Sequence, residues 1–216
     1  MTEKIFHDAP EGGLAYVVRE GESSYPLHIL MLHGWSGDER VMWVLESVLP
    51  DEAPVASLRG LYPLAGDGYQ WTNQRASIQT SLEDLVPASA AVQVTLAALT
   101  DRHSFKPQRV VPMGFSQGAA LSFTLAESLE EKPRAVIALA GYYPNGQVDR
   151  ILDIPVFWGH GTRDELVPIN RARQDVEMLQ AKGANVHYCE TDVGHKLGIE
   201  CTRGLKLWLN GLISSP

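Results

Sequence analysis

Residues 109–125 read Arg-Val-Val-Pro-Met-Gly-Phe-Ser-Gln-Gly-Ala-Ala-Leu-Ser-Phe-Thr-Leu, an apolar run followed by a helix-forming one. The pattern predicts a buried strand over Arg109–Met113 and a helix over Gln117–Leu129. Between them, Gly114–Gly118 has the form Gly-x-Ser-x-Gly, which is typical of a serine on a sharp strand-to-helix turn. Glycines on both sides let neighbouring backbone approach without a Cβ clash. The stretch therefore predicts an exposed Ser116 hydroxyl at the edge of a sheet, although a glycine-rich turn with a capping serine would read the same way.

The same alternation of apolar runs and helical patterns extends over the chain and indicates a mostly parallel sheet wrapped by helices. No repeat or low-complexity tract divides it, so we expect one α/β domain spanning residues 1–216. The other predicted strands are Leu14–Val18, Leu27–His33, Val55–Leu58, Ala135–Ala140, Pro155–Trp158 and Asn185–Cys189. The other predicted helices are Glu39–Leu49, a long one from about Ser77 to Leu99, Ile169–Lys182 and Glu200–Leu212.

Two segments carry more specific signals. Pro87 lies inside the long predicted helix, where proline removes a backbone donor, so we expect a kink or a new helix start there. The segment Gly60–Asn73 fits neither the helical nor the strand period and is predicted to be a functional loop.

Composition excludes several classes of protein. The 216 residues hold 18 Lys and Arg against 26 Asp and Glu, a net charge of −8, which disfavours binding to nucleic acid or to anionic membranes. We see no apolar run of membrane-spanning length and no secretory leader in the first residues. Cys189 and Cys201 form no disulfide framework, so we predict two free thiols and a cytoplasmic location.

A nucleophilic serine needs a base and an acid that orients the base. On a turn of this kind they follow in the order serine, acid, histidine. After Ser116 and any plausible acid only His187 and His195 remain, and His187 lies inside a predicted strand. We therefore predict His195 as the base.

The predicted acid is Asp164, which follows the strand ending at Trp158. Glu165 and Asp192 are its rivals, Asp192 being better interpreted as a turn residue. His160, in the same segment, is interpreted as a structural residue that anchors the Asp164 loop.

Two backbone N–H groups should stabilise an oxyanion. Gln117 follows the nucleophile, and Trp35 lies in a glycine-bearing loop after the strand that ends at His33, so these two are the predicted donors. No dinucleotide fingerprint and no metal-ligand spacing are present in the sequence, so we expect no cofactor and no metal.

Together these segments resemble the phospholipase/carboxylesterase family of α/β-hydrolases, which includes acyl-protein thioesterases. The resemblance runs from Leu30 to about Leu197 and rests on Leu-His-Gly-Trp-Ser-Gly-Asp-Glu, the Gly-Tyr-Gln-Trp loop, Met-Gly-Phe-Ser-Gln-Gly, His-Gly-Thr-Arg-Asp-Glu and Gly-His. It implies a compact serine hydrolase without a cap domain, with Ser116, Asp164 and His195 as its triad. The chain departs from the family where Trp35 replaces a small residue and Gln70 replaces a serine.

We accordingly predict a serine esterase that cleaves carboxylic esters with short to medium acyl groups through an acyl-enzyme. Thioesterase or lysophospholipase action on lipid-acylated substrates uses the same residues, and a non-catalytic ligand-binding module is a further alternative. The expected partner is a small-molecule ester, with no nucleic acid and no stable membrane association, while the oligomeric state stays open. The predicted pocket walls are Leu61, Tyr62, Tyr69, Trp71 and Tyr142 or its neighbour Tyr143.

Overall fold

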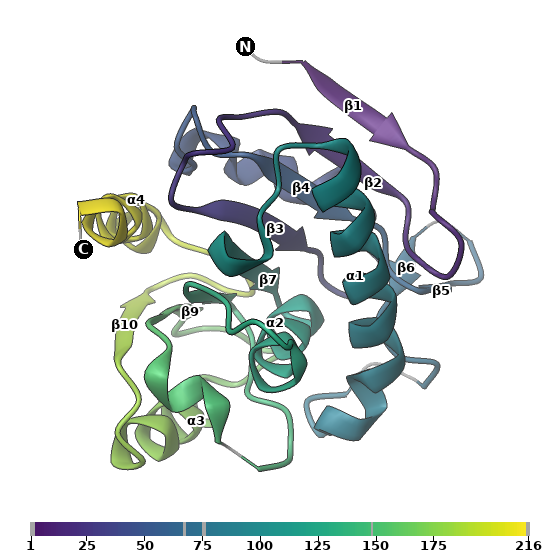
Figure 1. The fold of residues 1–216 in the computed structure, drawn as a ribbon. Coiled ribbons are helices and arrows are strands. Elements are labelled where there is room, and N and C mark those ends of the chain that lie inside the picture. The colour runs from purple at the N-terminus through teal and green to yellow at the C-terminus, as the bar shows by residue number, and fades with distance from the viewer. Residues whose placement is uncertain (1–2, 67, 75–76, 148, 215–216) are drawn as a thin grey trace.

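The computed structural model describes residues 3–66, 68–74, 77–147 and 149–214. Within these ranges the core is an eight-stranded sheet in the order β1-β2-β4-β3-β7-β8-β9-β10 (Figure 1). Pairing is parallel from β4 to β10, and β2 is antiparallel to both β1 and β4. The strands are β1 (Lys4–His7), β2 (Tyr16–Arg19), β3 (His28–Leu32), β4 (Val55–Leu58), β7 (Val110–Phe115), β8 (Val136–Leu139), β9 (Val156–Gly161) and β10 (Val186–Thr191). The predicted α/β fold with a mostly parallel sheet is confirmed.

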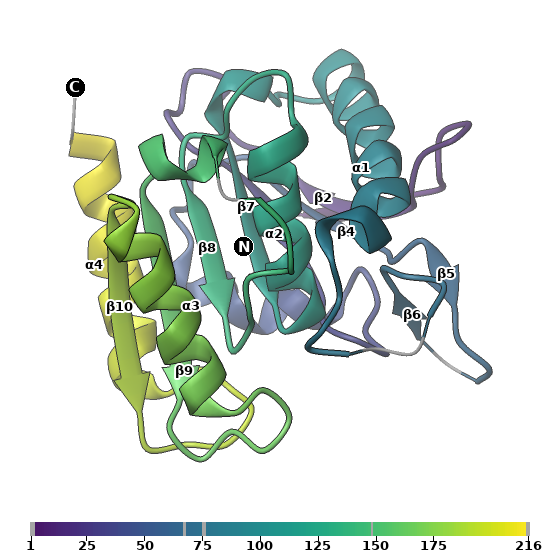
Figure 2. The ribbon, with the colours of Figure 1, turned by 90° about the horizontal axis from the view of Figure 1, so that it is seen from below.

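Helices cover both faces of this sheet. Apolar side chains of α1 (Leu82–Arg102), α2 (Gln117–Ser128) and α3 (Ile169–Ala181) pack on one face. The short 3₁₀ helix η1 (Val41–Val48) and α4 (Ile199–Ser214) pack on the other. Figure 2 shows β8 and β10 pointing the same way, so the loops after the parallel strands gather at one edge of the sheet. This edge holds the predicted site residues.

The long helix α1 differs from its prediction. It begins at Leu82 rather than near Ser77, and its start is fixed by a capping box in which Ser81 and Asp84 bond each other's backbone N–H groups. Helix α1 then continues through Pro87 without a new start, because the lost N–H lies only in its second turn and the remaining turns pack on the core.

By length and composition α1 is also the helix that could cross a membrane among the described residues, which the sequence prediction missed. Its face with Leu85, Val92 and Leu99 lies in the hydrophobic core of the fold. We therefore interpret α1 as a core helix.

Several local predictions need correction. The predicted helix Glu39–Leu49 is instead the shorter 3₁₀ helix η1, Val41–Val48. The loop Gly60–Asn73 contains a small hairpin, β5 (Tyr62–Pro63) with β6 (Tyr69–Gln70). Strand β1 was not predicted, because as an edge strand it is mostly exposed and shows no alternation of apolar residues. Further 3₁₀ turns lie at η2 (Pro107–Arg109) and η3 (Arg150–Asp153).

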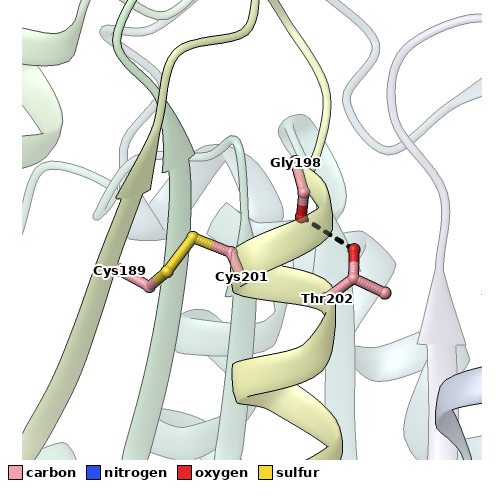
Figure 3. The surroundings of a disulfide bond; sticks show 4 residues. All are labelled: Cys189, Gly198, Cys201 and Thr202. Atoms are coloured by element: carbon pink, nitrogen blue, oxygen red, sulfur yellow. Dashed lines mark hydrogen bonds between the residues drawn. A yellow bond between two sulfur atoms is a disulfide. The ribbon is translucent and has the colours of Figure 1, made fainter.

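The prediction of two free thiols is wrong. Cys189, near the end of β10, and Cys201, in the first turn of α4, form a disulfide with their Cα atoms 5.7 Å apart (Figure 3). Sequence spacing could not reveal it, because the pairing depends on α4 folding back against β10. The disulfide closes the segment that contains His195.

Candidate active site

Ser116 occupies a strained turn between β7 and α2. Its φ is +54° and its ψ is −115°, a conformation that non-glycine residues rarely adopt. A Cβ at Gly114 would lie 2.0 Å from the Gly118 carbonyl oxygen, and one at Gly118 would lie 2.1 Å from the Leu32 carbonyl oxygen. The flanking glycines are therefore required for α2 to approach the sheet this closely.

Asp164 and His195 form a hydrogen-bonded pair. The Nδ1–H of His195 donates to Oδ2 of Asp164 over 2.7 Å, which leaves Nε2 of the imidazole for a second partner. The other carboxylate oxygen accepts the N–H groups of Leu166 and Val167, each over 2.9 Å, so the carboxylate cannot rotate freely. The Asp164 side chain is wholly buried. The pair therefore holds one histidine tautomer in a fixed orientation.

The alternative candidates for the acid and the base do not take part in this pair. Glu165 and His187 are exposed. The Asp192 carboxylate pairs with Arg163 at the surface, with 2.8 Å between Nε and Oδ1. His160 is fully buried, and its Nε2–H donates to the Val167 carbonyl over 2.9 Å, so it holds the Asp164 loop as predicted. Burial lowers the pKa of His160, which keeps this ring neutral beside Asp164.

Two contacts join the histidine loop and the loop after β3 to the serine turn. The ring of Phe115, the residue before Ser116, lies 4.9 Å from the His195 ring between centroids. A Cβ at Gly34 would lie 3.3 Å from the Ser116 Cβ, so the Gly34–Trp35 backbone passes directly beside the serine. Serine, histidine and the Trp35 loop therefore share one small region.

The loops around Ser116 are fastened by buried hydrogen bonds. The Gln117 side-chain oxygen accepts the Trp71 backbone N–H over 3.0 Å, and the Trp71 indole N–H donates to the His33 carbonyl over 2.7 Å. His33 in turn bonds Gly34 through Nδ1 and Gly60 through Nε2. Gln117 opens α2, where the first N–H groups have no acceptor within the helix. The Gln117 backbone N–H is thus available at the turn, while the Gln117 side chain holds the loop that carries Trp71.

A pocket of about 370 Å³ opens beside Ser116. Its lining residues are Trp35, Ser77, Ile78, Ser116, Gln117, Tyr142, Leu166 and Val167.

Tyr142 is the residue among the predicted walls that lines this pocket. Trp71 is wholly buried in the core, Leu61 packs against that core, and Tyr143 is buried with its hydroxyl on Glu127. Tyr62 and Tyr69 belong to the β5–β6 hairpin, and Tyr69 lines a different, polar pocket. Neither tyrosine of the hairpin therefore lines the Ser116 pocket.

Sequence reasoning missed the residue that joins the walls of this pocket. Arg171, on α3, donates to the Ile78 carbonyl over 2.8 Å, to the Tyr143 carbonyl over 2.6 Å and to Asp175 over 2.9 Å. Asp175 also accepts the Tyr143 N–H, and burial raises its carboxyl pKa. A mid-helix arginine four residues before an aspartate gives no local signal of this role, because its partners come from distant loops.

The chain is similar to several known proteins. The chain is 29% identical to acyl-protein thioesterase 1 of Debaryomyces hansenii over 132 residues, 57% of this chain and 56% of the relative. The chain thus spans little more than half of that relative's length.

Two solved structures share the fold. The carboxylesterase from Mesorhizobium loti superposes with a TM-score of 0.81 at 20% identity, covering 96% of this chain and 99% of the other. The Bacillus cereus carboxylesterase gives 0.80 at 22% identity, with 92% and 94% covered. The phospholipase/carboxylesterase family model matches residues 54–206, most of the chain. The chain is a hydrolase-fold protein that belongs to the phospholipase/carboxylesterase family.

Proposed function

We propose that the protein is a serine hydrolase that cleaves carboxylic esters with short to medium acyl groups. The observation that carries this proposal is the His195–Asp164 hydrogen bond of 2.7 Å beside the strained Ser116 turn. A hydroxyl is a weak nucleophile unless an adjacent base removes its proton, and an imidazole fixed by a buried carboxylate is such a base.

The proposed reaction has two stages. Ser116 Oγ attacks the carbonyl carbon while Nε2 of His195 takes its proton, and the oxyanion binds the backbone N–H groups of Trp35 and Gln117. The bond from carbon to the leaving oxygen then breaks, and His195 passes the proton to that oxygen. Water, deprotonated by His195, attacks the acyl-enzyme, the bond between the acyl carbon and Ser116 Oγ breaks, and His195 returns its proton to Oγ as the acid is released. Asp164 orients the imidazole and stabilises its charged form throughout.

A fluorophosphonate probe tests this proposal directly, because it reacts only with an activated serine. We expect the purified protein to gain one adduct, located at Ser116 by peptide mass spectrometry, and the His195→Ala variant to gain none at the same probe concentration. An unlabelled wild-type protein would instead support the non-catalytic ligand-binding alternative.

Thioester cleavage is the second candidate, and the relatives named acyl-protein thioesterase favour it. The same residues would act on a thioester, with the proton passing to a thiolate. Measuring kcat/KM for an ester and a thioester with the same acyl group distinguishes the two activities. A thioester-to-ester ratio of kcat/KM above the ratio of the two uncatalysed hydrolysis rates would favour the thioesterase.

Location and partners are part of the proposal. A small-molecule substrate in the cytoplasm is the sequence-based prediction, but a disulfide such as Cys189–Cys201 is rare in a reducing compartment. Trapping thiols with iodoacetamide in intact cells, followed by mass spectrometry, tests the location. Two alkylated cysteines would support the cytoplasm, whereas survival of the Cys189–Cys201 disulfide seen in the structure would contradict it.

A further inference from the structure

A second pocket borders Trp35 and is separate from the pocket that contains Ser116. Its volume is about 400 Å³, within the range of small-molecule sites. Its lining residues are Gly34, Trp35, Ser36, Gly37, Val41, Met42, Val44, Leu45, Phe115, Leu139, Lys196 and Leu197. Trp35 lines both pockets and therefore forms the partition between them.

The lining of this second pocket is mostly apolar, with Ser36 and Lys196 as its polar side chains, and it is open to solvent. Val44 is 80% exposed, Trp35 53% and Val41 46%, although each is a large apolar side chain. Contiguous exposed apolar surface on a hydrolase fold commonly marks a ligand groove. A polar group entering this pocket would lose water with little to replace it, whereas a hydrocarbon group would gain by leaving water.

The chemistry of the proposed reaction determines which part of the substrate lies here. His195 must protonate the leaving oxygen, so the leaving group lies on the side of the imidazole. Lys196 and Leu197 follow His195 directly, and Phe115 packs on its ring at 4.9 Å. The Ser116 pocket is lined instead by Gln117, by Ile78 and Tyr142, and by Leu166 and Val167 of the Asp164 loop, and its lining includes no residue that follows His195.

We infer that the second pocket binds the leaving group, and that this group is an uncharged ring-bearing or branched hydrocarbon alcohol or thiol. The inference rests on the proposed function and extends it to the substrate class. The acyl group lies in the Ser116 pocket, and Trp35 separates the two halves of the substrate. Small alcohols such as ethanol would leave this pocket empty, and glycerol would bring hydroxyls without partners.

The test uses butyrate esters of ethanol, glycerol and cyclohexylmethanol, which form the same acyl-enzyme. For the wild-type protein we expect kcat/KM for the cyclohexylmethyl ester to exceed that for the ethyl and glyceryl esters at least tenfold. Val44→Asp places a charge at the pocket mouth on a side chain that is 80% exposed, so folding is preserved. It should lower the ratio of kcat/KM for the cyclohexylmethyl ester to that for the ethyl ester at least fivefold.

Val86→Asp is the matched control, because Val86 is 56% exposed on α1 and lines neither pocket. It should keep the wild-type ratio, and Val41→Asp should repeat the effect of Val44→Asp at an independent position.

Other results would overturn the inference while leaving the proposed function standing. These are a wild-type ratio near one, equal ratios in Val44→Asp and Val86→Asp, or a change in acyl-length preference instead of alcohol preference. A concentration-dependent dimer in light scattering that Val44→Asp dissociates would also overturn it, because the pocket would then be an interface between two copies.

A wild-type protein that takes up fluorophosphonate at Ser116 but hydrolyses no ester of the set overturns the inference alone. Absence of that labelling overturns the proposed function as well.

Discussion

Gly60 donates its backbone N–H to Nε2 of His33 over 2.8 Å, and this bond joins the segment after β4 to the loop that carries Trp35. Nδ1 of the same ring donates to the Gly34 carbonyl over 2.6 Å, so the imidazole is neutral and has one fixed tautomer. Burial lowers the pKa of His33, in agreement with a neutral ring. His33 therefore shapes the loop that carries Trp35, the predicted oxyanion donor.

His33→Ala should destabilise the protein and slow catalysis together. The buried Gly60 N–H and the Gly34 carbonyl would both lose their partner, at about 1–3 kcal/mol for each unsatisfied group. We expect the free energy of unfolding in urea to fall by about 2–4 kcal/mol, with kcat reduced because the Trp35 N–H shifts. His33→Gln, whose amide retains a donor and an acceptor, should recover part of both losses. Equal losses in the two variants would contradict this interpretation.

Removal of the nucleophile should abolish turnover without affecting the fold. Ser116→Ala is expected to lower kcat by about 10⁴–10⁶, as in other triads, and His195→Ala by a similar amount. Asp164→Ala should have a smaller effect, because the imidazole can still act when it is poorly oriented. Turnover of a chromogenic ester in the steady state measures all three, with thermal unfolding as the folding control. Wild-type rates in Ser116→Ala would rule out the mechanism.

Acyl length should improve catalysis only until the Ser116 pocket is full. Each buried methylene contributes about 0.8 kcal/mol, or roughly fourfold in kcat/KM. A pocket of about 370 Å³ holds a short to medium chain, and only residues 141–153 separate Ala140 from Ile154, too few for a cap domain.

An ester series with one alcohol should therefore rise in kcat/KM and then level off, with no jump when the substrate forms micelles. A steady rise through long chains, or activation at the micellar threshold, would favour a lipid-directed enzyme.

The Cys189–Cys201 disulfide should stabilise both the fold and the position of the proposed base. It joins β10 to α4 across the segment that contains His195. Closing a loop of this length contributes about 3 kcal/mol. The Cys189→Ala/Cys201→Ala double variant should therefore unfold about 5–10 °C lower and turn over more slowly. Dithiothreitol should lower the melting temperature of the wild type and leave that of the variant unchanged. A wild-type melting temperature that does not change with dithiothreitol would contradict a formed disulfide.

Stability should fall as the pH drops below 6.5, in part because of His28. Its Nδ1 accepts the Lys106 N–H over 2.8 Å, its Nε2–H donates to the Tyr25 carbonyl over 3.1 Å, and burial lowers its pKa to about 4. Because the folded pKa lies below the unfolded one, the contribution is complete above pH 6.5 and is lost between pH 6.5 and about 4, at up to about 1.4 kcal/mol per pH unit. Urea unfolding across this range measures it, and His28→Asn should show a shallower slope than wild type. Parallel slopes would contradict the assignment.

The sequence predicts the sheet and the serine turn well because their signals are local. Apolar runs indicate buried parallel strands, and Gly114 and Gly118 lie where backbones approach most closely. The order serine, acid, histidine points to Asp164 and His195 because strand-end loops share one edge. The remaining features depend on tertiary contacts. Cys201 reaches Cys189 only through the packing of α4, and Arg171 reaches Ile78 and Tyr143 only through the position of α3. In the sequence, aromatic residues after Gly60 are equally consistent with a pocket wall or with the core. The structure shows Trp71 to be a core residue, because its side chain is wholly buried.

Trp35 lies 53% exposed between the two pockets, whereas Trp71 and Trp158 are wholly buried. Its indole is therefore a built-in optical probe of the site. A ligand that enters either pocket removes water from the exposed Trp35 indole and alters its emission, while the buried Trp71 and Trp158 and the partly buried Trp43 and Trp208 supply the background. Binding can thus be followed in real time in the Ser116→Ala variant, without any label and without turnover.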